Sequence, residues 1–503
     1  MQNIDANEPP HVIPHTPSGL PNGRPNLVIF MPDQLRYDAL QCSGLNRVVK
    51  TPQIDTFASR GVRFSECYVQ ASVCTQSRCS MFTGLYPHVS GHRSLENLIK
   101  PWEPNLFRSL KEHGYHVACM APRGTCSRPS HQGDRGEGDE RPEEEISIWE
   151  RLFYKGRRDA SKAVDYDEAA IRSAEKWLEC PPDDRPWVLF LPLLFPHCPF
   201  TVEEPYFSMY KREEMPPPSS PEDKTGYEPV YMQMIRDRYG THRASPEIWA
   251  EVSATYHGMI SRLDDQFGRI VDKIDSKGLW DSTITMFFTD HGEYLGDHGL
   301  IEKWPSGLSE TLVREPLIIA GGGIPAGLVR DCMTEMVDLV PTVLQLCGIN
   351  ETFPHNGKSL LPVILHDAPH REFAFSEGGF LLSEEPLLER ASFPYDLKSQ
   401  LQHEDTRWVG KAISMRDHHW TYIYRLYEPA ELYDRRADPL ELHNLAADPR
   451  FVHQARLMES QMFRWMVETS DFLPYSKDGR FPQVDLPSPK ALWEERKARS
   501  GER

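Results

Sequence analysis

Short runs of consecutive apolar residues alternate along most of the chain with longer amphipathic stretches. The apolar runs, which are typical of strands buried on both faces, cover residues 26–31, 64–69, 187–191, 283–288 and 317–320. The stretches with helical periodicity cover residues 52–58, 168–178, 247–278 and 336–346. Because strands alternate with helices, we expect an α/β fold with a mostly parallel central sheet and helices on both of its faces.

Two stretches interrupt this pattern, and the pattern itself changes towards the C-terminus. Residues 123–145 are rich in Gly, Pro and charge, and residues 215–239 begin with a run of prolines, so we expect both to be loops, the second a candidate lid. We expect substrate specificity to depend on these two loops and on a third at residues 380–405. Residues 411–416 and 420–425 predict an antiparallel hairpin, and residues 452–467 a closing helix. The predicted organisation is therefore a polar N-terminal tail (1–25), a catalytic domain (26–375) and a C-terminal α+β subdomain (376–503).

Composition narrows the function classes. With 39% hydrophobic and 26% charged residues the chain is typical of globular proteins, and a net charge of −18 disfavours nucleic acids and acidic membranes as partners. No apolar run approaches the roughly 20 residues of a membrane-spanning helix. The N-terminus lacks the pattern of a signal peptide, which predicts a cytoplasmic protein, or an exported one if the chain is truncated. The sequence leaves a homo-oligomer open.

The ten cysteines form no C-x-x-C pair and no zinc-binding pattern. We expect seven of them to be small buried apolar residues. These are Cys42, Cys67, Cys119, Cys180, Cys198, Cys332 and Cys347.

Polar residues follow two of the predicted strands directly. Asp33 and Gln34 come after the first strand, and Asp290 and His291 after the strand at 283–288. A single Asp in such a place is usually a helix cap or a turn former. Two such pairs at the carboxyl ends of parallel strands, where ligands collect, favour a divalent metal site. Oxygen-rich ligands with one imidazole suit Ca²⁺, Mg²⁺ or Mn²⁺ better than a structural zinc.

Residues 73–84 read VCTQSRCSMFTG, with Cys74 four residues before Arg78. This segment resembles the signature of the type I sulfatases, in which a Cys followed by x-Pro-x-Arg is oxidised to formylglycine; here Gln76 replaces the Pro. The resemblance extends over most of the chain. It includes Asp33-Gln34, residues 51–55, Pro196-His197-x-Pro199-Phe200, Asp290-His291-Gly292, Lys303 and the C-terminal segment 432–445.

The resemblance implies an alkaline-phosphatase-like α/β/α sandwich, closed by a smaller antiparallel subdomain, that hydrolyses sulfate esters. It implies one divalent metal, with Ca²⁺ expected first and Mn²⁺ or Mg²⁺ as alternatives. The implied metal ligands are Asp33, Gln34, Asp290, His291 and the modified Cys74, and the implied catalytic residues are Cys74, Arg78, His197 and Lys303. Gln34 and His291 replace the Asp and Asn of many arylsulfatases, which resembles the phosphonate monoester hydrolase branch.

One segment departs from the sulfatase pattern. After Gly114-Tyr115, sulfatases commonly read Gly-Lys-x-His, whereas this chain supplies neither the lysine nor the histidine at residues 120–125. We expect Arg123 or Thr125 to occupy that space. Together with His92 and Asn97, they are the candidate substrate-binding residues.

Three functions remain open at this point. The first is hydrolysis of a small-molecule or saccharide sulfate ester, with a formylglycine-generating enzyme as maturation partner. The second is hydrolysis of phosphonate monoesters or phosphodiesters by the same residues. The third, a catalytically silent anion-binding relative, is suggested by Gln76 and the missing Gly-Lys-x-His. A silent site, however, need not keep all of Asp33, Asp290, His291, Arg78 and Lys303.

Overall fold

A computed structural model describes residues 23–120, 153–161, 164–391, 395–470, 480 and 488–500. Its central sheet has the strand order β10-β2-β8-β7-β1-β5-β3, with β9 paired to β2. The expected mostly parallel sheet is confirmed: β1 runs parallel to both β5 and β7, with Leu27 opposite Val188 and Ile284. The exception is β8, which runs antiparallel to both β2 and β7.

The elements have the following bounds. The strands of the central sheet are β1 (Asn26–Asp33), β2 (Gly61–Tyr68), β3 (His116–Cys119), β5 (Trp187–Pro196), β7 (Thr283–Phe288), β8 (Arg314–Gly321), β9 (Leu328–Arg330) and β10 (Thr334–Glu335). A separate pair is formed by β4 (Tyr154–Arg157) and β6 (Phe200–Val202). The helices up to residue 404 are α1 (Pro52–Ser59), α2 (Cys74–Thr83), α3 (Pro87–Ser90), α4 (Leu106–Glu112), α6 (Tyr166–Trp177), α7 (Val230–Tyr239), α8 (Pro246–Ser276), α9 (Glu310–Val313), α10 (Leu339–Leu346), α11 (Leu361–His366) and α12 (Asp396–Glu404).

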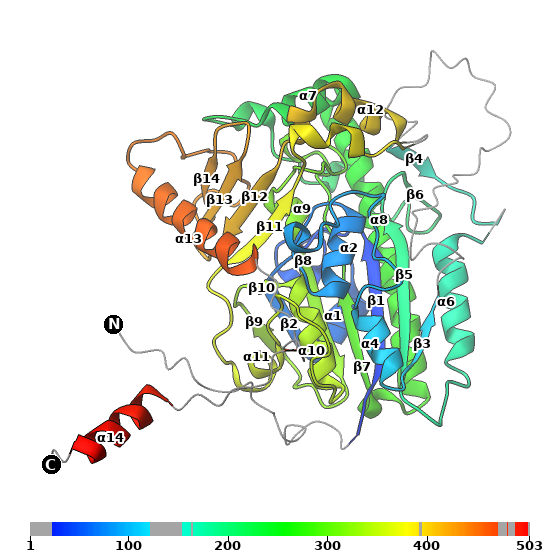
Figure 1. Ribbon diagram of the computed structural model, residues 1–503. Coiled ribbons are helices and arrows are strands. Elements are labelled where there is room, and N and C mark those ends of the chain that lie inside the picture. Colours follow the sequence, from blue (N-terminus) through cyan, green and yellow to red (C-terminus); the bar gives the residue numbers. More distant parts are fainter. Residues whose placement is uncertain are drawn as a thin grey trace. The chain divides into compact units, whose positions relative to one another are not determined.

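Helices cover the central sheet on both faces, as expected (Figure 1). Helices α2, α4 and α10 pack together on one face, and α1, α6 and α8 on the other. The five strands predicted from apolar runs are all present, and β1, β5, β7 and β8 are buried along nearly their whole length. Removal of this apolar surface from water is the main favourable term in folding such a sandwich.

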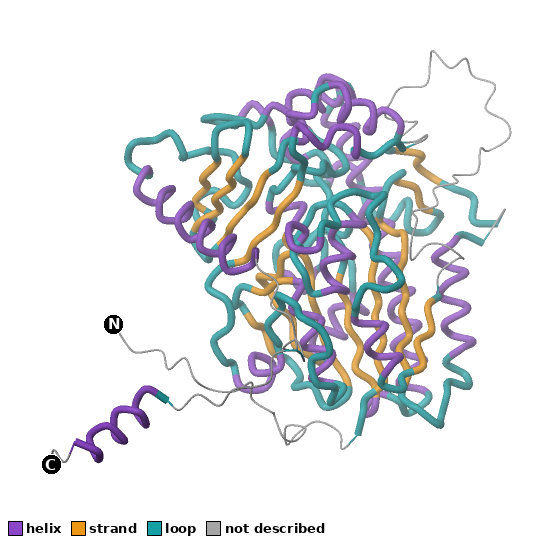
Figure 2. Tube along the Cα trace, viewed as in Figure 1, coloured by secondary structure: helices purple, strands orange, loops and turns teal. Residues whose placement is uncertain are grey.

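A second sheet, wholly antiparallel, lies beside the central one (Figure 2). It consists of β11 (Ala374–Gly378), β12 (Ala412–Arg416), β13 (Trp420–Arg425) and β14 (Glu431–Asp434) in that order. Helix α13 (Val452–Ser470) packs on it through Trp465, whose ring stacks on Phe375 with centroids 4.3 Å apart. The predicted hairpin and closing helix are therefore confirmed. This sheet begins at Ala374, so β11 crosses the position at which the sequence predicts the subdomain to start.

Two predicted loops are wrong in part. Residues 215–239 end in α7, because Tyr231, Met232 and Ile235 bury one face of a helix that stops at Gly240 in the left-handed conformation. Residues 380–405, expected to be a specificity loop, contain a 3₁₀ turn (Leu382–Leu387) and α12. The expected loop at 123–145 lies outside the described residues.

The cysteine prediction also needs correction. Cys67, Cys198 and Cys347 are buried, but Cys42 and Cys332 are only half-buried, and Cys119 and Cys180 are exposed. Cys119 is the last residue of β3, and Cys180 follows the C-cap residue of α6, Leu178, by two positions. Residues 472–503 form a separate unit that contains α14 (Pro489–Ser500). None of the helices in the described ranges is long and apolar enough to cross a membrane.

Candidate active site

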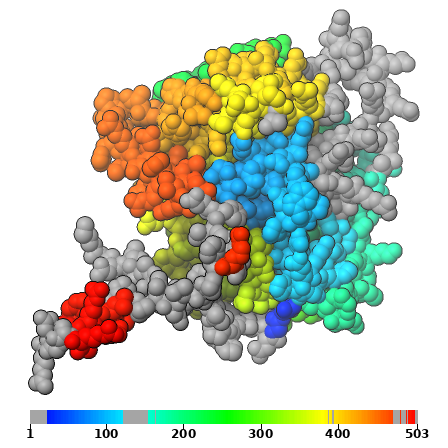
Figure 3. All heavy atoms as spheres, viewed as in Figure 1, coloured from blue at the N-terminus to red at the C-terminus, as the bar shows by residue number. Residues whose placement is uncertain are grey.

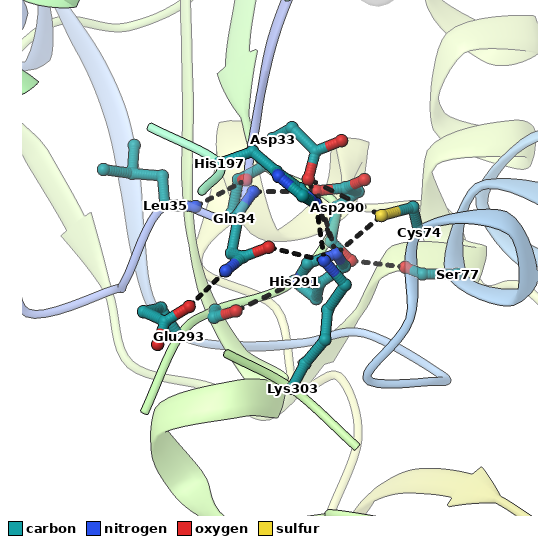
Figure 4. Close-up of polar contacts among 12 residues, drawn as sticks. Asp33, Gln34, Leu35, Cys74, Ser77, His197, Asp290, His291, Glu293 and Lys303 are labelled. Carbon is teal, nitrogen blue, oxygen red and sulfur yellow. Dashed lines mark hydrogen bonds and ion pairs between the residues drawn. The ribbon is translucent and has the colours of Figure 1, made fainter. Parts of the chain in front are cut away.

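The ends of two neighbouring strands bring the predicted polar pairs together. β1 ends at Asp33 and β7 at Phe288, and since these strands are parallel neighbours, Asp33 and Asp290 emerge at the same edge of the sheet. Gln34 adopts a left-handed conformation (φ 66°), and its backbone N–H donates to Oδ1 of Asp290 across 3.2 Å (Figure 4). Asp33 and Asp290 therefore meet at one edge of the sheet, as the sequence predicts.

Cys74 is the first residue of α2 and points into this edge. The preceding Val73 is extended and the helix ends at Gly84, which takes a left-handed φ of 68°. Sγ of Cys74 lies 3.0 Å from Nε2 of His291 and 3.6 Å from Oδ1 of Asp33. The start of a helix favours negative charge, so α2 presents position 74 where an anionic group would be stabilised.

Four residues could hold a cation at this point. One ligand atom each from Asp33, Cys74, Asp290 and His291 lies within 4.8 Å of the others. Nδ1 of His291 faces the carbonyl oxygen of Gly292 at 2.9 Å, and burial lowers the pKa of His291 to about 3, so Nε2 presents a lone pair to the group. Burial and the neighbouring Asp290 raise the pKa of Asp33 to about 7. Two carboxylates buried this close need positive charge nearby.

Close packing fixes the residue after His291. A Cβ atom on Gly292 would lie 1.9 Å from the carbonyl oxygen of Thr311, so no other residue fits without moving the backbone.

Arg78 supplies part of the positive charge. Its Nε donates to Oδ2 of Asp290 across 2.7 Å, and a terminal nitrogen donates to Oδ2 of Asp33 across 2.6 Å. The guanidinium thus bridges the two carboxylates from one turn further along α2 than Cys74. This contact adds a role to the one expected from the sequence, since Arg78 holds both acidic side chains in fixed orientations.

Lys303 and His197 lie next to this cluster (Figure 4). Nζ of Lys303 lies 2.8 Å from Nε2 of His197 and 3.3 Å from a carboxylate oxygen of Glu302. Burial alone would lower the pKa of Lys303, but the neighbouring Cys74, Glu302 and Asp33 raise it above its usual value. The site therefore keeps a buried ammonium group next to the carboxylate cluster.

Gln34 turns its side chain towards Lys303. Its Oε1 accepts a hydrogen bond from Nζ of Lys303 at 2.5 Å, and its Nε2 donates to Glu293. Because Oε1 is shared with the ammonium group, its role as a metal ligand stays a prediction.

Of the four candidate substrate-binding residues, His92 and Asn97 lie in the described part of the chain and bond within their own loop. Nδ1 of His92 lies 2.7 Å from the carbonyl oxygen of Asn97, and its Nε2 lies 3.3 Å from Glu103. The amide of Asn97 donates to the carbonyl oxygen of Gly91 at 2.5 Å. These bonds stabilise the loop of residues 91–103, and substrate contact by either residue stays a prediction. Arg123 and Thr125 lie outside the described residues.

Three residues near the site were missed at the sequence level. Glu293 accepts the backbone N–H groups of Leu295 and Glu302 and so fixes the turn after β7. Glu302 pairs with Lys303, and Tyr395 reaches the site from a distant part of the chain, with Oη 3.4 Å from Nε2 of His197. The position of Glu302 beside Lys303 was a usable signal, whereas nothing in the pattern around Tyr395 pointed to the site.

Comparisons with known proteins agree with this geometry. The chain matches the family described as Sulfatase over residues 25–349. It is 29% identical to the multifunctional alkaline phosphatase superfamily protein PehA of Trinickia caryophylli, over 70% of this chain and 81% of that protein. It is 26% identical to a choline-sulfatase of Rhizobium meliloti, over 83% of this chain and 81% of that one.

A solved structure shows the same fold. The phosphonate monoester hydrolase of Agrobacterium radiobacter aligns with a TM-score of 0.71 at 22% identity, and the alignment covers 89% of this chain and 96% of that one. With the family match spanning residues 25–349 and the strand-end site in place, the chain belongs to the sulfatase family, within the alkaline phosphatase-like superfamily.

Proposed function

We propose that this protein hydrolyses sulfate esters, with Cys74 in its formylglycine form and one divalent cation held at the strand ends. The observation that carries the proposal is that a cluster of possible cation ligands lies beside a buried ammonium group. Asp33, Cys74, Asp290 and His291 converge within 4.8 Å, and the buried ammonium of Lys303 lies beside them on His197. Hydrolysis of an ester anion needs a nucleophile that is activated by a cation. It also needs positive charge that stabilises the oxygens of the ester.

The donor set suits a hard divalent cation. Two carboxylates and one imidazole nitrogen are ligands that Ca²⁺, Mn²⁺ or Mg²⁺ accept, and we place Ca²⁺ first because most of the donors are oxygens. Asp33, Asp290 and His291 would hold it, with position 74 and Gln34 as further ligands. When bound, the cation supplies Lewis-acid polarisation of a substrate oxygen and lowers the pKa of the nucleophile.

Position 74 is the nucleophile. In the formylglycine form, the hydrated aldehyde would offer two hydroxyls at this position, one able to attack a sulfuryl group and one able to restore the aldehyde by expelling sulfate. The N-terminus of α2 favours the negative charge that develops at this position. Arg78 keeps Asp33 and Asp290 from turning away from the nucleophile, because its guanidinium bonds to both.

Lys303 and His197 act on the substrate's side. Nδ1 of His197 faces the carbonyl oxygen of Cys198 at 2.5 Å, so the ring proton is on Nδ1 and Nε2 is an acceptor for the Lys303 ammonium. When an ester anion enters, Nζ of Lys303 can donate to its oxygens and neutralise the alkoxide or phenoxide that leaves. The carboxylate of Glu302, 3.3 Å from Nζ, favours the protonated form of Lys303.

The substrate class is a small-molecule or saccharide sulfate ester. Similar proteins include the choline-sulfatase of Rhizobium meliloti and an N-acetylglucosamine-6-O-sulfatase of Bacteroides thetaiotaomicron, which is 23% identical. Maturation requires a formylglycine-generating enzyme as a partner.

A second function uses the same residues on phosphonate monoesters or phosphodiesters. Gln34 and His291 favour it, since they stand where many arylsulfatases have Asp and Asn, and the similar structure from Agrobacterium radiobacter is a phosphonate monoester hydrolase. These substrates carry one negative charge at neutral pH, as sulfate monoesters do, so the charge of the site alone does not separate the two.

A substrate panel tests both functions. Protein whose Cys74 modification has been verified by mass spectrometry is assayed with an aryl sulfate, an aryl phosphonate monoester and a phosphodiester, and kcat/KM is compared. We expect the aryl sulfate to give the highest value and Cys74→Ala to abolish turnover of all three. A higher value for the phosphonate would replace the first function by the second. No turnover by modified, metal-loaded protein would leave only the anion-binding alternative.

A further inference from the structure

The start of α12 reaches the active site from the C-terminal part of the chain. Figure 3 shows the yellow segment around residues 380–405 lying against the light-blue segment that contains α2 and the loop after α3. Contacts confirm this: Arg93 pairs with Glu384, and the backbone N–H of Leu95 donates to Glu389 at 2.9 Å. Tyr395, immediately before α12, is therefore carried to the same edge of the sheet as Cys74.

The side chain of Tyr395 lies edge-on to His197. The two ring centroids are 6.3 Å apart with an interplanar angle of 80°, and Oη of Tyr395 is 3.4 Å from Nε2 of His197. Nζ of Lys303 reaches the same nitrogen at 2.8 Å. Because Nδ1 of His197 faces a carbonyl oxygen, Nε2 offers one lone pair, and two donors converge on it.

This convergence defines a place for an anion. One lone pair accepts one strong hydrogen bond, and the ammonium group at 2.8 Å is the closer donor. An oxygen atom of an anion has more lone pairs and a higher charge than an imidazole nitrogen, so both Lys303 and Tyr395 gain by donating to it instead. The phenol hydroxyl and the ammonium group thus both lie next to Nε2 of His197, where the oxygen of an anion would meet two donors.

A buried ion-pair chain ties the position of Tyr395 to that of Lys303. Lys398, in the first turn of α12, bonds to both carboxylate oxygens of Glu302 at 2.9 and 3.2 Å, and Glu302 lies 3.3 Å from Nζ of Lys303. The backbone N–H of Ser399 donates to the carbonyl oxygen of Tyr395 at 2.9 Å. Lys398 therefore anchors the first turn of α12 to Glu302, which lies in the turn after β7. This contact keeps the hydroxyl of Tyr395 at a fixed distance from the ammonium group of Lys303.

The phenol group keeps its proton in this environment. Burial raises the pKa of Tyr395 well above its usual value, and the nearby thiol and carboxyl groups of Cys198, Glu302, Cys74 and Asp33 raise it further. Oη is thus a neutral hydrogen-bond donor at neutral pH.

We propose that Tyr395 is a second hydrogen-bond donor of the anion subsite, beside Lys303, and that its hydroxyl contacts an oxygen of the transferring sulfuryl group. The proposal rests on the proposed function for the identity of the anion, but the subsite would bind a free oxyanion in the same way. A donor supplied from α12 also means that residues after the central sheet take part in substrate binding.

The test compares wild-type protein with Tyr395→Phe, which removes only the hydroxyl. Both are prepared with their metal, and modification of Cys74 is measured. A hydrogen bond to a charged group contributes about 1.5–3 kcal/mol, which corresponds to a loss of roughly 10- to 150-fold in kcat/KM for an aryl sulfate. We expect the dissociation constant for inorganic sulfate, measured by calorimetry, to rise by a similar factor. Tyr206→Phe is the matched control, since its hydroxyl bonds to Asp265 away from the site.

The two measurements separate this proposal from the proposed function. If wild-type protein binds sulfate without hydrolysing any ester and Tyr395→Phe weakens that binding, the donor role stands and the function fails. If the ester is hydrolysed and Tyr395→Phe matches wild type in kcat/KM and in sulfate affinity, the donor role is overturned. A lower kcat/KM with unchanged sulfate affinity also overturns it. No sulfate binding by metal-loaded wild-type protein overturns both.

A second variant covers the case in which Tyr395→Phe does not fold. Incorporation of 3-fluorotyrosine at position 395 keeps the ring and the hydroxyl but makes the phenol more acidic and a stronger donor. We expect sulfate to bind more tightly than to wild type and to shift the fluorine resonance. Unchanged affinity of this variant would overturn the proposal.

Discussion

The ammonium group of Lys303 lies 2.8 Å from Nε2 of His197, although the two residues follow different strands of the sheet. His197 comes directly after β5, and Lys303 comes at the end of the turn that begins after β7. Each is buried, so neither side chain reaches water as an ordinary surface lysine or histidine would. A buried ammonium on a neutral imidazole is costly unless it serves an incoming anion.

Removal of either partner should impair turnover by a similar amount. We expect Lys303→Met and His197→Gln each to lower kcat/KM about 10²–10³-fold, because the first removes a donor to the developing negative charge and the second removes the acceptor that positions this donor. The double variant should be little worse than either single one, because residues that act as a unit have non-additive effects. Steady-state kinetics of the four proteins give the coupling energy.

The chain offers a matched control for this cycle. Nζ of Lys224 lies 3.3 Å from Nδ1 of His298, a second buried Lys–His pair that is separate from the carboxylate cluster. Lys224→Met should change the free energy of unfolding and leave kcat/KM within about twofold. Strict additivity at Lys303 and His197 would contradict a shared role.

Removal of the metal should abolish activity and lower stability. Asp33 and Asp290 are buried side by side. Without the cation, only the positive charges of Arg78 and Lys303 offset the repulsion between the two carboxylates. A ligand present at 100 times its Kd stabilises the folded state by about 2.7 kcal/mol, and the melting temperature should fall accordingly after chelation. Thermal unfolding with Ca²⁺, Mn²⁺ or Mg²⁺ added back identifies the preferred ion.

Two asparagine variants show whether stabilisation by the metal depends on the carboxylates at the strand ends. Asp290→Asn should abolish the response to added metal. Asp297→Asn should retain it, because Asp297 pairs with Arg36 and bonds to Ser219 instead. Full activity of protein shown by elemental analysis to be metal-free would refute the metal site.

Gln76 should be compatible with maturation of Cys74. It is the third residue of α2, where a backbone N–H has no acceptor within the helix, so either Gln or Pro fits the backbone. Its amide donates to the carbonyl oxygen of Arg93 at 2.9 Å, a bond that Gln76→Pro gives up at a cost of about 1 kcal/mol. We expect mass spectrometry to find the aldehyde or its hydrate at position 74 in wild type and in Gln76→Pro alike.

Cys79 serves as the internal standard of that measurement, since it should remain a thiol in both proteins. An intact thiol at Cys74 in wild type, with aldehyde in Gln76→Pro, would show that this maturation system requires the proline. The proposed mechanism would then apply only to the variant.

The sequence predicted the parts of the site that depend on strand ends and missed those that depend on packing across the chain. Asp33, Asp290 and His291 could be found because a buried strand has a visible apolar run and its carboxyl end is known. Tyr395 and Lys398 could not, since their positions depend on α12 docking against the β7 turn. The same limit explains why α7 was not predicted within residues 215–239. The prolines are visible in the sequence, but the burial of Tyr231 and Ile235 that stabilises this helix is not.

Glu310 should make stability depend on acid pH. It bonds to Arg416 at 2.9 Å and to Arg435 at 2.8 Å, and so joins α9 to the C-terminal sheet. Although burial raises it, these guanidinium groups lower its pKa overall, from 4.5 to about 2. A depressed carboxyl pKa contributes stability that is present above the unfolded value and is lost as the pH falls from 4.5 through 2.

Glu310→Gln removes this contribution. At pH 7 the variant should be less stable than wild type by about 3–5 kcal/mol, the usual cost of breaking a buried ion pair. The difference should shrink steadily below pH 4.5, which denaturant unfolding at several pH values would show. Arg108→Gln is a suitable control, because its exposed pair with Glu112 should contribute less than about 1 kcal/mol. A difference that does not vary with pH would contradict the assignment.

The strand order also determines how long Cys74 stays accessible during synthesis of the chain. Position 74 becomes enclosed only when β1 has paired with β7, and β7 ends at Phe288. At a synthesis rate of roughly 5–20 residues per second, on the order of ten to forty seconds pass between the emergence of Cys74 and that of Phe288 from the ribosome. During that interval the thiol is still accessible to a modifying enzyme, whereas in the finished fold it is buried. Conditions that speed translation or early folding would therefore lower the yield of active protein without changing a single residue.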